Sequence, residues 1–307
     1  MARGPVDRAG QAPLQDTAKI EKTRPIASGA EDGRLLDWNE IQCIKSVLQA
    51  HNDTGIRDGL CQHTEDLTSK LVNIHSHLFG AALFFAFPAY YFLKHPYFQD
   101  AKPADFIVFS TFFFGVGICF FLSSTFHTVS NHSPRVNVIG NQLDYLGIVI
   151  LMWGSTIPSV YYGYYCDPNL QKLYWAMVTV LAAACTITTL APTFRHPTLR
   201  PWRAVMYTGL GFSFLIPMLH GLIIYGWRVQ NYRMSLSWMG IMTLFNLTGA
   251  VIYALRAPER YLPRRYDIVG SSHQILHFMV IFAGITHLVG LLEALKHVRE
   301  GTVPCLA

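Results

Sequence analysis

The sequence has little charge for its length. Charged residues make up 14% of the 307 residues and apolar residues 51%, whereas soluble domains are about 25% charged. This balance excludes a water-soluble fold, and with it a soluble metalloprotease. The formal net charge of +5 lies mostly in tails and short loops, and no basic stripe of the kind that binds DNA is present. We therefore expect contacts with membrane lipids and no nucleic acid partner.

Cysteine patterns and a signal peptide are also missing. The six cysteines form no CxxC pair, and two of them lie inside apolar stretches, so neither a disulfide framework nor a cysteine zinc site is expected. Residues 1–35 are rich in Gly, Pro and charge and contain no apolar run that could form the core of a signal peptide. They bury too little apolar surface to offset the entropy of ordering, so we expect a disordered cytosolic tail.

Seven long apolar segments are the main feature that is present. A helix needs roughly 20 apolar residues to cross a hydrocarbon core ~30 Å thick. Segments of that kind run over residues 73–93, 104–127, 143–165, 173–192, 204–226, 235–255 and 273–295. The sequence therefore predicts an all-α integral membrane protein, a seven-transmembrane helix bundle over residues 73–295, followed by a short extracytosolic tail at 296–307.

A short amphipathic helix is expected before the first span, within a cytosolic juxtamembrane region at residues 36–72. Asp37 is an N-cap residue with Glu40 three positions further on, which is the spacing of a capping box. The apolar residues that follow fall on one helical face. Two interpretations stay open: the helix lies on the membrane surface, or it packs on the cytosolic ends of the bundle.

The basic residues of the connections indicate how the chain is oriented. The loops after spans two, four and six contain eight Arg, against five Lys or Arg in the loops after spans one, three and five. By the positive-inside rule, the even loops and the N-terminus are cytosolic and the C-terminus lies on the other side. We expect a multi-pass protein of the plasma membrane or the endoplasmic reticulum.

Three histidines gather at the expected cytosolic end of the bundle. His127 closes the second span, and His273 and His277 open the seventh. Residues four apart on a helix project from one face about one turn apart, which suits a single metal ion. Three histidines with a fourth position left for water are typical of catalytic zinc. The sequence therefore predicts a Zn²⁺ site with His127, His273 and His277 as ligands.

Two further polar residues lie at the same level. Asp144 opens the third span and is the candidate general base for a zinc-activated water, because Gln274 stands where an HExxH motif would have Glu. Ser123, one turn before His127, is placed to hold that water or a developing oxyanion. Simpler roles stay open: Asp144 pairs with a loop Arg or caps its helix, and Ser123 bonds its own backbone. His75 and His77, at the start of the first span, are close enough in the expected topology to reach the site, but contact with lipid headgroups is the preferred expectation.

Four short motifs then give the sequence a family resemblance. They are Ser123-x3-His127, Leu143-Asp144-Tyr145-x-Gly147, Ala257-Pro258-Glu259-Arg260 and Ser272-His273-Gln274-Ile275-x-His277. With these motifs the chain resembles the progestin and adipoQ receptor family, which contains the adiponectin receptors and the fungal zinc-homeostasis proteins and is related to hemolysin III. The resemblance covers roughly residues 36–295.

The resemblance implies a fold, a metal site and several functions. It implies a seven-helix bundle with a cytosolic N-terminus and a zinc held by His127, His273 and His277, with Asp144 and Ser123 beside the metal's water. Members of the family are linked to ceramidase-type hydrolysis of sphingolipid amides, to receptor signalling and to zinc homeostasis. The resemblance does not choose among these functions.

One segment departs from the family pattern. Family members run His-Asn-Glu-Thr-x-Asn-Ile into the first span, whereas seventeen residues separate Gly55 from Asn73 here. Joining Gly55 to Asn73 would restore the pattern. We therefore interpret residues 56–72 as an insertion or an unspliced in-frame intron.

Three functions compete at this stage. The first is a zinc-dependent amidohydrolase acting on a membrane lipid, with ceramide or another sphingolipid as substrate. The second is a seven-helix receptor in which zinc is structural and an extracellular protein ligand biases two helix arrangements. The third is a zinc-homeostasis protein without hydrolase activity, which binds the metal reversibly. The receptor hypothesis predicts that signalling needs the histidines but not Asp144.

Overall fold

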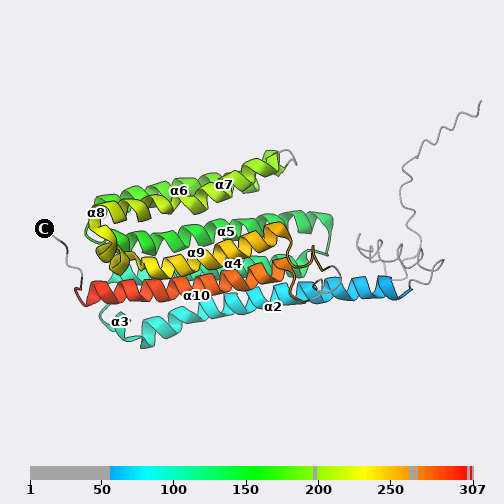
Figure 1. Cartoon of the computed structure of the whole chain (residues 1–307), viewed down its shortest axis with the longest axis horizontal. Coiled ribbons are helices and arrows are strands. Elements are labelled where there is room, and N and C mark those ends of the chain that lie inside the picture. Colours follow the sequence, from blue (N-terminus) through cyan, green and yellow to red (C-terminus); the bar gives the residue numbers. More distant parts are fainter. Residues whose placement is uncertain (1–55, 196–198, 263–265, 267–268, 303–304, 306–307) are drawn as a thin grey trace, which may run out of the picture. The chain divides into compact units, whose positions relative to one another are not determined.

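The fold is a bundle of long helices, seen in a computed structural model of the chain (Figure 1). The structure describes residues 56–195, 199–262, 266, 269–302 and 305. The expected tail and amphipathic helix lie outside these residues. The helices, in chain order, are α2 (Ile56–Lys94), α3 (Pro96–Gln99), α4 (Pro103–Val129), α5 (Pro134–Gly163), α6 (Pro168–Leu190), the 3₁₀ helix η1 (Pro192–Arg195), α7 (Arg200–Ser213), α8 (Leu215–Met234), α9 (Leu236–Leu255) and α10 (Ser272–Arg299). No strand occurs within the described ranges.

Seven helical segments are long and apolar enough to cross a membrane, which confirms the predicted fold class. They are Lys70–Lys94, Pro103–Val129, Pro134–Gly163, Pro168–Leu190, Val205–Met234, Leu236–Leu255 and Ser272–Arg299. The third begins nine residues before the predicted boundary at residue 143, because Ser133 caps the helix by accepting a hydrogen bond from the Val136 amide at 3.3 Å. The first residues of this helix include polar side chains, so hydropathy alone placed its start too late in the sequence.

Helix α2 is longer than the first span. It runs without interruption for 39 residues from Ile56 to Lys94, and only its part from Lys70 onward is apolar enough to cross a membrane. Residues 56–72 therefore continue the axis of the first span as a helix. Whether they are an insertion stays a prediction.

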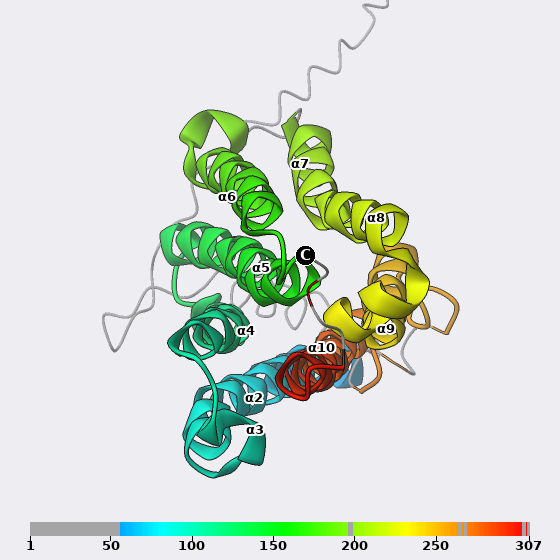
Figure 2. The same cartoon turned by 90° about the vertical axis from the view of Figure 1, so that its left-hand side faces the viewer.

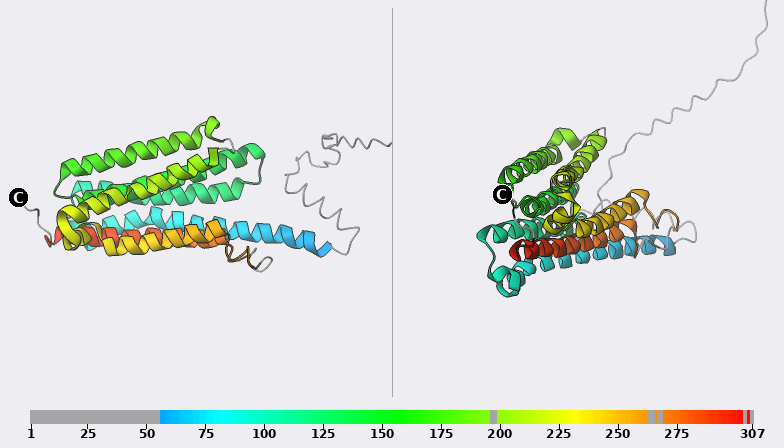
Figure 3. Two further views of the ribbon diagram at one scale, coloured as in Figure 1. Left: turned by 45° about the horizontal axis from the view of Figure 1, so that its top comes forward. Right: turned by 60° about the vertical axis from the view of Figure 1, so that its left-hand side comes forward.

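The helices form a closed ring that can be followed end-on in Figure 2. The order of packed neighbours is α2, α4, α5, α6, α7 with α8, α9, α10 and then α2 again. The side views of Figure 3 show α10 lying along both α2 and α9. A membrane ring of this kind satisfies every backbone polar group within the helices and leaves apolar side chains toward lipid.

The closest helix pair is α4 with α5, and small residues make this approach fit. A Cβ atom added to Gly154 would lie 2.5 Å from the Thr111 carbonyl oxygen and 3.2 Å from the Gly115 Cα. Small residues at such contacts let two backbones approach and gain van der Waals packing in lipid, where no hydrophobic force drives association. The α4–α5 pair carries three of the candidate site residues, Ser123, His127 and Asp144, so this packing fixes the separation between the two helices at the site.

A polar cluster and a disulfide hold the end of the bundle where α10 ends. Asp105 is fully buried and accepts hydrogen bonds from the Tyr162 hydroxyl at 2.9 Å and the Lys102 amide at 2.8 Å, and it forms an ion pair with Arg299. Cys166 and Cys305 form a disulfide across 139 residues. The cysteine pattern did not predict this bond, because the two partners carry no spacing motif and meet only through the fold.

We expect Gly154→Ala to destabilise the protein, because the added methyl group would collide with backbone atoms of α4. The cost of such overpacking is about 1–3 kcal/mol, which a thermal unfolding scan in detergent detects as a lower midpoint. Gly209→Ala in α7 is the matched control, since nothing lies within 4 Å of its added Cβ. Equal midpoints for the two variants would show that the α4–α5 contact is looser than the structure has it.

Candidate metal centre

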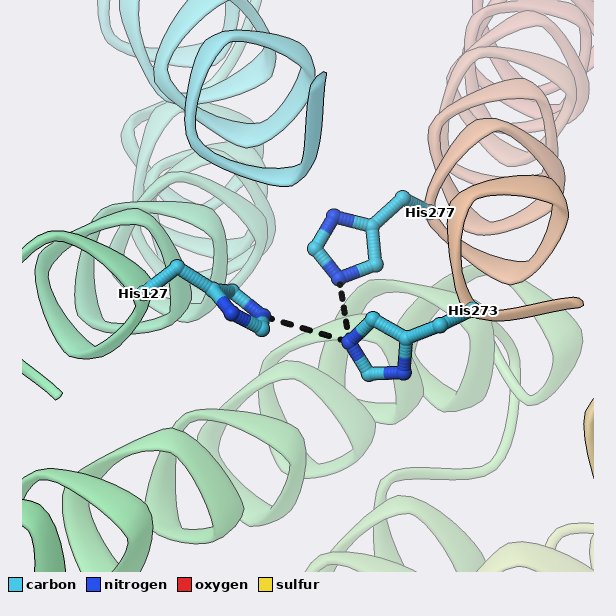
Figure 4. A group of neighbouring side chains, drawn as sticks. All are labelled: His127, His273 and His277. Atoms are coloured by element: carbon cyan, nitrogen blue, oxygen red, sulfur yellow. Dashed lines mark hydrogen bonds between the residues drawn. The ribbon is translucent and has the colours of Figure 1, made fainter. Parts of the chain in front are cut away.

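The three predicted histidines meet at one end of the ring. His127 lies in the last turn of α4, and His273 and His277 lie in the first two turns of α10. Figure 4 shows their imidazole rings pointing toward one another. The Nε2 atom of His273 lies 3.2 Å from Nε2 of His127 and 3.2 Å from Nε2 of His277. One ligand atom from each histidine falls within 4.8 Å of the others.

This spacing suits a tetrahedral metal ion. Two nitrogens bound to zinc at 2.0–2.1 Å with tetrahedral angles are about 3.3–3.4 Å apart, and two of the three observed separations are 3.2 Å. The donors are neutral imidazole nitrogens from two helices, which is a donor set that zinc prefers. The cluster can therefore hold a metal ion of this kind without rebuilding the helices.

A hydroxyl on α2 orients one of the ligands. The Ser76 hydroxyl donates to the Asn73 carbonyl oxygen at 3.1 Å, and its oxygen lies 3.3 Å from Nδ1 of His277. With the hydroxyl proton used in this way, Ser76 can accept a hydrogen bond from His277 only when that ring carries its proton on Nδ1. That tautomer leaves the Nε2 lone pair free for a metal, as partners of metal-binding histidines commonly ensure.

A carboxylate fixes the start of α10. Glu259 accepts hydrogen bonds from the Ser272 amide at 2.9 Å and from the Ser272 hydroxyl, which satisfies a free donor at the helix N-terminus. Burial acts to raise the pKa of Glu259, but the bonds from Ser272 outweigh it and hold that pKa below its ordinary value. Because His273 directly follows Ser272, this cap fixes the position of the first candidate metal ligand.

Asp144 and Ser123 are brought near each other by the packing of α4 against α5. The Ser123 hydroxyl lies close enough to interact with the Asp144 carboxyl group. Ser123 is buried, and His127 follows it by one helical turn. The predicted proximity of these residues is thus present, whereas Asp144 is not among the residues whose ligand atoms lie within 4.8 Å of one another.

His77 is the residue whose place sequence reasoning missed. The preferred expectation, contact with lipid headgroups, is wrong for His77, and the alternative that it reaches the site holds: it is buried with 5% exposure and its ring stacks on His277 with centroids 3.6 Å apart. His75, two residues earlier, is exposed as expected. The signal that separates them is helical spacing: Asn73, Ser76 and His77 are polar residues that share one face of an otherwise apolar helix.

Fold and site together define a multi-pass membrane protein with a candidate metal centre built from histidines of two helices. The haemolysin-III related family matches residues 66–288. The chain belongs to this family, and the resemblance to the progestin and adipoQ receptors is confirmed.

Curated relatives from animals and fungi agree with this assignment. The adiponectin receptor protein of Drosophila melanogaster is 37% identical over 265 residues, covering 85% of this chain and 55% of its own length. Progestin and adipoQ receptor-like protein 1 of Caenorhabditis elegans is 38% identical, covering 82% and 54%. ADIPOR-like receptor IZH2 of Saccharomyces cerevisiae is 34% identical over 304 residues, covering 95% and 93%. The chain thus spans about half the length of the two animal relatives.

We expect about one zinc ion per chain in the purified protein, and little in the His273→Ala variant, because two remaining histidines do not hold a tetrahedral ion. Metal analysis of both proteins in the same detergent measures this. His132→Ala is the control, since His132 is exposed just beyond α4. A folded wild-type protein without metal would contradict the prediction.

Proposed function

We propose that the protein is a zinc-dependent lipid amide hydrolase. The observation that carries this proposal is the convergence of three histidines, together with Asp144 near Ser123, which lies one helical turn before His127. A structural metal needs its ligands alone, whereas a hydrolase also needs a group that accepts a proton from water. Asp144 is a carboxylate of that kind, held on a separate helix from the histidines.

The roles of the residues follow from their positions. Zinc, when bound, supplies a Lewis acid that makes water acidic and polarises a carbonyl group. His127, His273 and His277 hold it through Nε2, and Ser76 keeps His277 in the correct tautomer. Asp144 accepts the proton of the attacking water and later delivers it to the departing amine. Ser123 lies close enough to Asp144 to help position its carboxylate.

The substrate we propose is a membrane lipid with an amide bond, with ceramide or another sphingolipid as the candidate that the family resemblance suggests. The histidines lie in the end turns of two membrane spans, the depth at which the amide of such a lipid meets its headgroup. Apolar side chains dominate the outer face of the neighbouring helices, for example Phe121 at 46% and Leu143 at 36% exposure. A lipid therefore reaches the site from the bilayer without crossing water.

We further propose that the histidine end faces the cytosol. Disulfides persist in oxidising compartments, and Cys166–Cys305 lies at the end of the bundle away from the histidines. Arg256 and Arg260 lie at the histidine end, between α9 and α10, as the positive-inside rule requires of a cytosolic loop. Seven spans then place the N-terminal side of the bundle in the cytosol, in the plasma membrane or the endoplasmic reticulum.

This orientation predicts which end an antibody reaches in cells whose plasma membrane alone is permeabilised. We expect an N-terminal tag to become accessible on permeabilisation. A C-terminal tag should not become newly accessible, because it is either already outside the cell or still enclosed in the endoplasmic reticulum. A C-terminal tag that appears only after permeabilisation would mean that the bundle is inverted.

The hydrolase mechanism predicts that Asp144→Asn keeps its zinc and loses hydrolysis of a short-chain ceramide by roughly 100-fold or more, the usual contribution of a general base. Fatty acid release by the purified protein measures this, with zinc content determined on the same sample. Asp167→Asn, a carboxylate at the opposite end that bonds Tyr225, should hydrolyse like the wild type. Wild-type rates in Asp144→Asn would remove Asp144 from the mechanism.

A receptor with a structural zinc is the second candidate, favoured by the receptor names of the fly, worm and yeast relatives. In that case the histidines hold helices together and an extracellular protein ligand acts at the opposite end. Zinc binding without hydrolysis, together with signalling that survives Asp144→Asn, would support it. A zinc-homeostasis role shares the metal site and differs in requiring release of the ion.

A further inference from the structure

The side of α2 that packs inside the ring of helices carries polar atoms that have no hydrogen-bond partner among the described residues. Asn73 is 5% exposed and His77 5% exposed, and they are one helical turn apart. The Asn73 side-chain oxygen Oδ1 has no hydrogen-bond partner, and neither ring nitrogen of His77 has one. Buried polar groups are nearly always paired, and leaving them unpaired at membrane depth is costly. Three such atoms on adjacent turns therefore indicate a ligand.

The His77 ring is packed against two aromatic side chains, and both of its nitrogens are buried. One face stacks on the His277 ring at a centroid distance of 3.6 Å and an interplanar angle of 14°. Phe120 packs against it with centroids 4.8 Å apart. Aromatic neighbours leave no room for the ring to turn away, so its two nitrogens are presented beside the metal ligand His277.

A histidine that serves packing looks different in the same protein. His287 is also buried in the ring, yet its Nε2 lies 3.2 Å from the Ser159 hydroxyl oxygen and its Nδ1 lies 2.9 Å from the Met242 sulfur. Both of its nitrogens have neighbours supplied by the fold. The contrast assigns His77 to an external ligand instead of to packing.

His77 is also separate from the metal cluster. The residues whose ligand atoms gather within 4.8 Å are His127, His273 and His277, and His77 is not among them although its ring touches His277. The nearest cation on its helix, Lys70, donates to the Asn131 side-chain oxygen at 2.7 Å. The free groups are thus a neutral amide oxygen and a neutral imidazole edge, which match hydroxyl and amide groups better than a phosphate.

We propose that Asn73 and His77 form the subsite that binds the polar headgroup of the lipid amide. Asn73 Oδ1 accepts a hydrogen bond from a headgroup hydroxyl, and the His77 edge exchanges hydrogen bonds with the same headgroup. The subsite selects lipids with free hydroxyl groups, and it rests on the proposed function for the identity of its ligand. The two residues bind the lipid and do not hold the metal.

The test separates binding from turnover and from metal loading. In full-length protein carrying Asp144→Asn, two probes are compared: a fluorescent short-chain N-acyl sphingosine and the same lipid with its hydroxyls O-methylated. His77→Phe keeps an aromatic ring on His277 and removes the nitrogens, and Asn73→Leu removes the amide at similar size. Each of these two variants should retain about one zinc per chain. Each should bind the hydroxylated lipid about tenfold more weakly, which is the effect expected from the loss of one hydrogen bond. Affinity for the methylated lipid should change less than twofold.

His75→Phe is the matched control, because His75 is exposed two residues away on the same helix, and it should bind both lipids like the parent protein. Loss of zinc from folded His77→Phe would overturn the proposal by making His77 part of the metal site. Equal weakening for both lipids would overturn it in favour of packing. If His77→Phe does not fold, Asn73→Leu decides alone by the same lipid comparison.

Failure of the subsite and failure of the hydrolase give different results. In one outcome, the Asp144→Asn protein prefers the hydroxylated lipid through Asn73 and His77, but the wild type hydrolyses neither probe. This result supports the subsite and contradicts the hydrolase function. In the other outcome, the wild type hydrolyses both probes equally and neither substitution affects binding. This result supports the hydrolase function and overturns the subsite.

Discussion

Every polar group buried at membrane depth needs a partner inside the protein, and the bundle is organised around that requirement. Asp105 is paired with Tyr162 and Arg299 where α4, α5 and α10 meet. Tyr174 and His220 bond each other at 2.5 Å between α6 and α8. Within the described residues, eight buried side-chain polar atoms have no hydrogen-bond partner, and three of them lie on Asn73 and His77, on neighbouring turns of α2.

The metal ligands come from helices that do not adjoin in the ring. His127 is on α4, His273 and His277 are on α10, and α2 lies between these helices and packs on both. A metal ion bound at this candidate site would tie α4 to α10 across the end of α2, and its binding energy would add to the stability of the helix ring. It also fixes the wall formed by Asn73 and His77, because Ser76 and His77 touch the ligand His277 directly.

Much of this arrangement could be predicted from the sequence, and there are physical reasons why the rest could not. Hydropathy predicted the seven spans, and the four-residue spacing of His273 and His277 predicted that they lie on one face of one helix. Both predictions depend only on residues that are near one another in the sequence. The burial of His77 depends on which side of α2 meets α10, and the Cys166–Cys305 bond depends on where two distant chain segments end up. Such properties belong to the packing of the ring and not to any window of sequence.

Helix α10 links the two ends of the molecule. Its first turns carry two metal ligands, with Glu259 capping its start, and its last turn holds Arg299 against Asp105 just before the segment tied down by Cys305. A helix fixed at both ends transmits a shift at one end as a rigid body. A ligand acting at the disulfide end would then change the spacing of His273 and His277 relative to His127, and with it the site's affinity for metal and lipid. The receptor and hydrolase hypotheses thus concern opposite ends of the same helix.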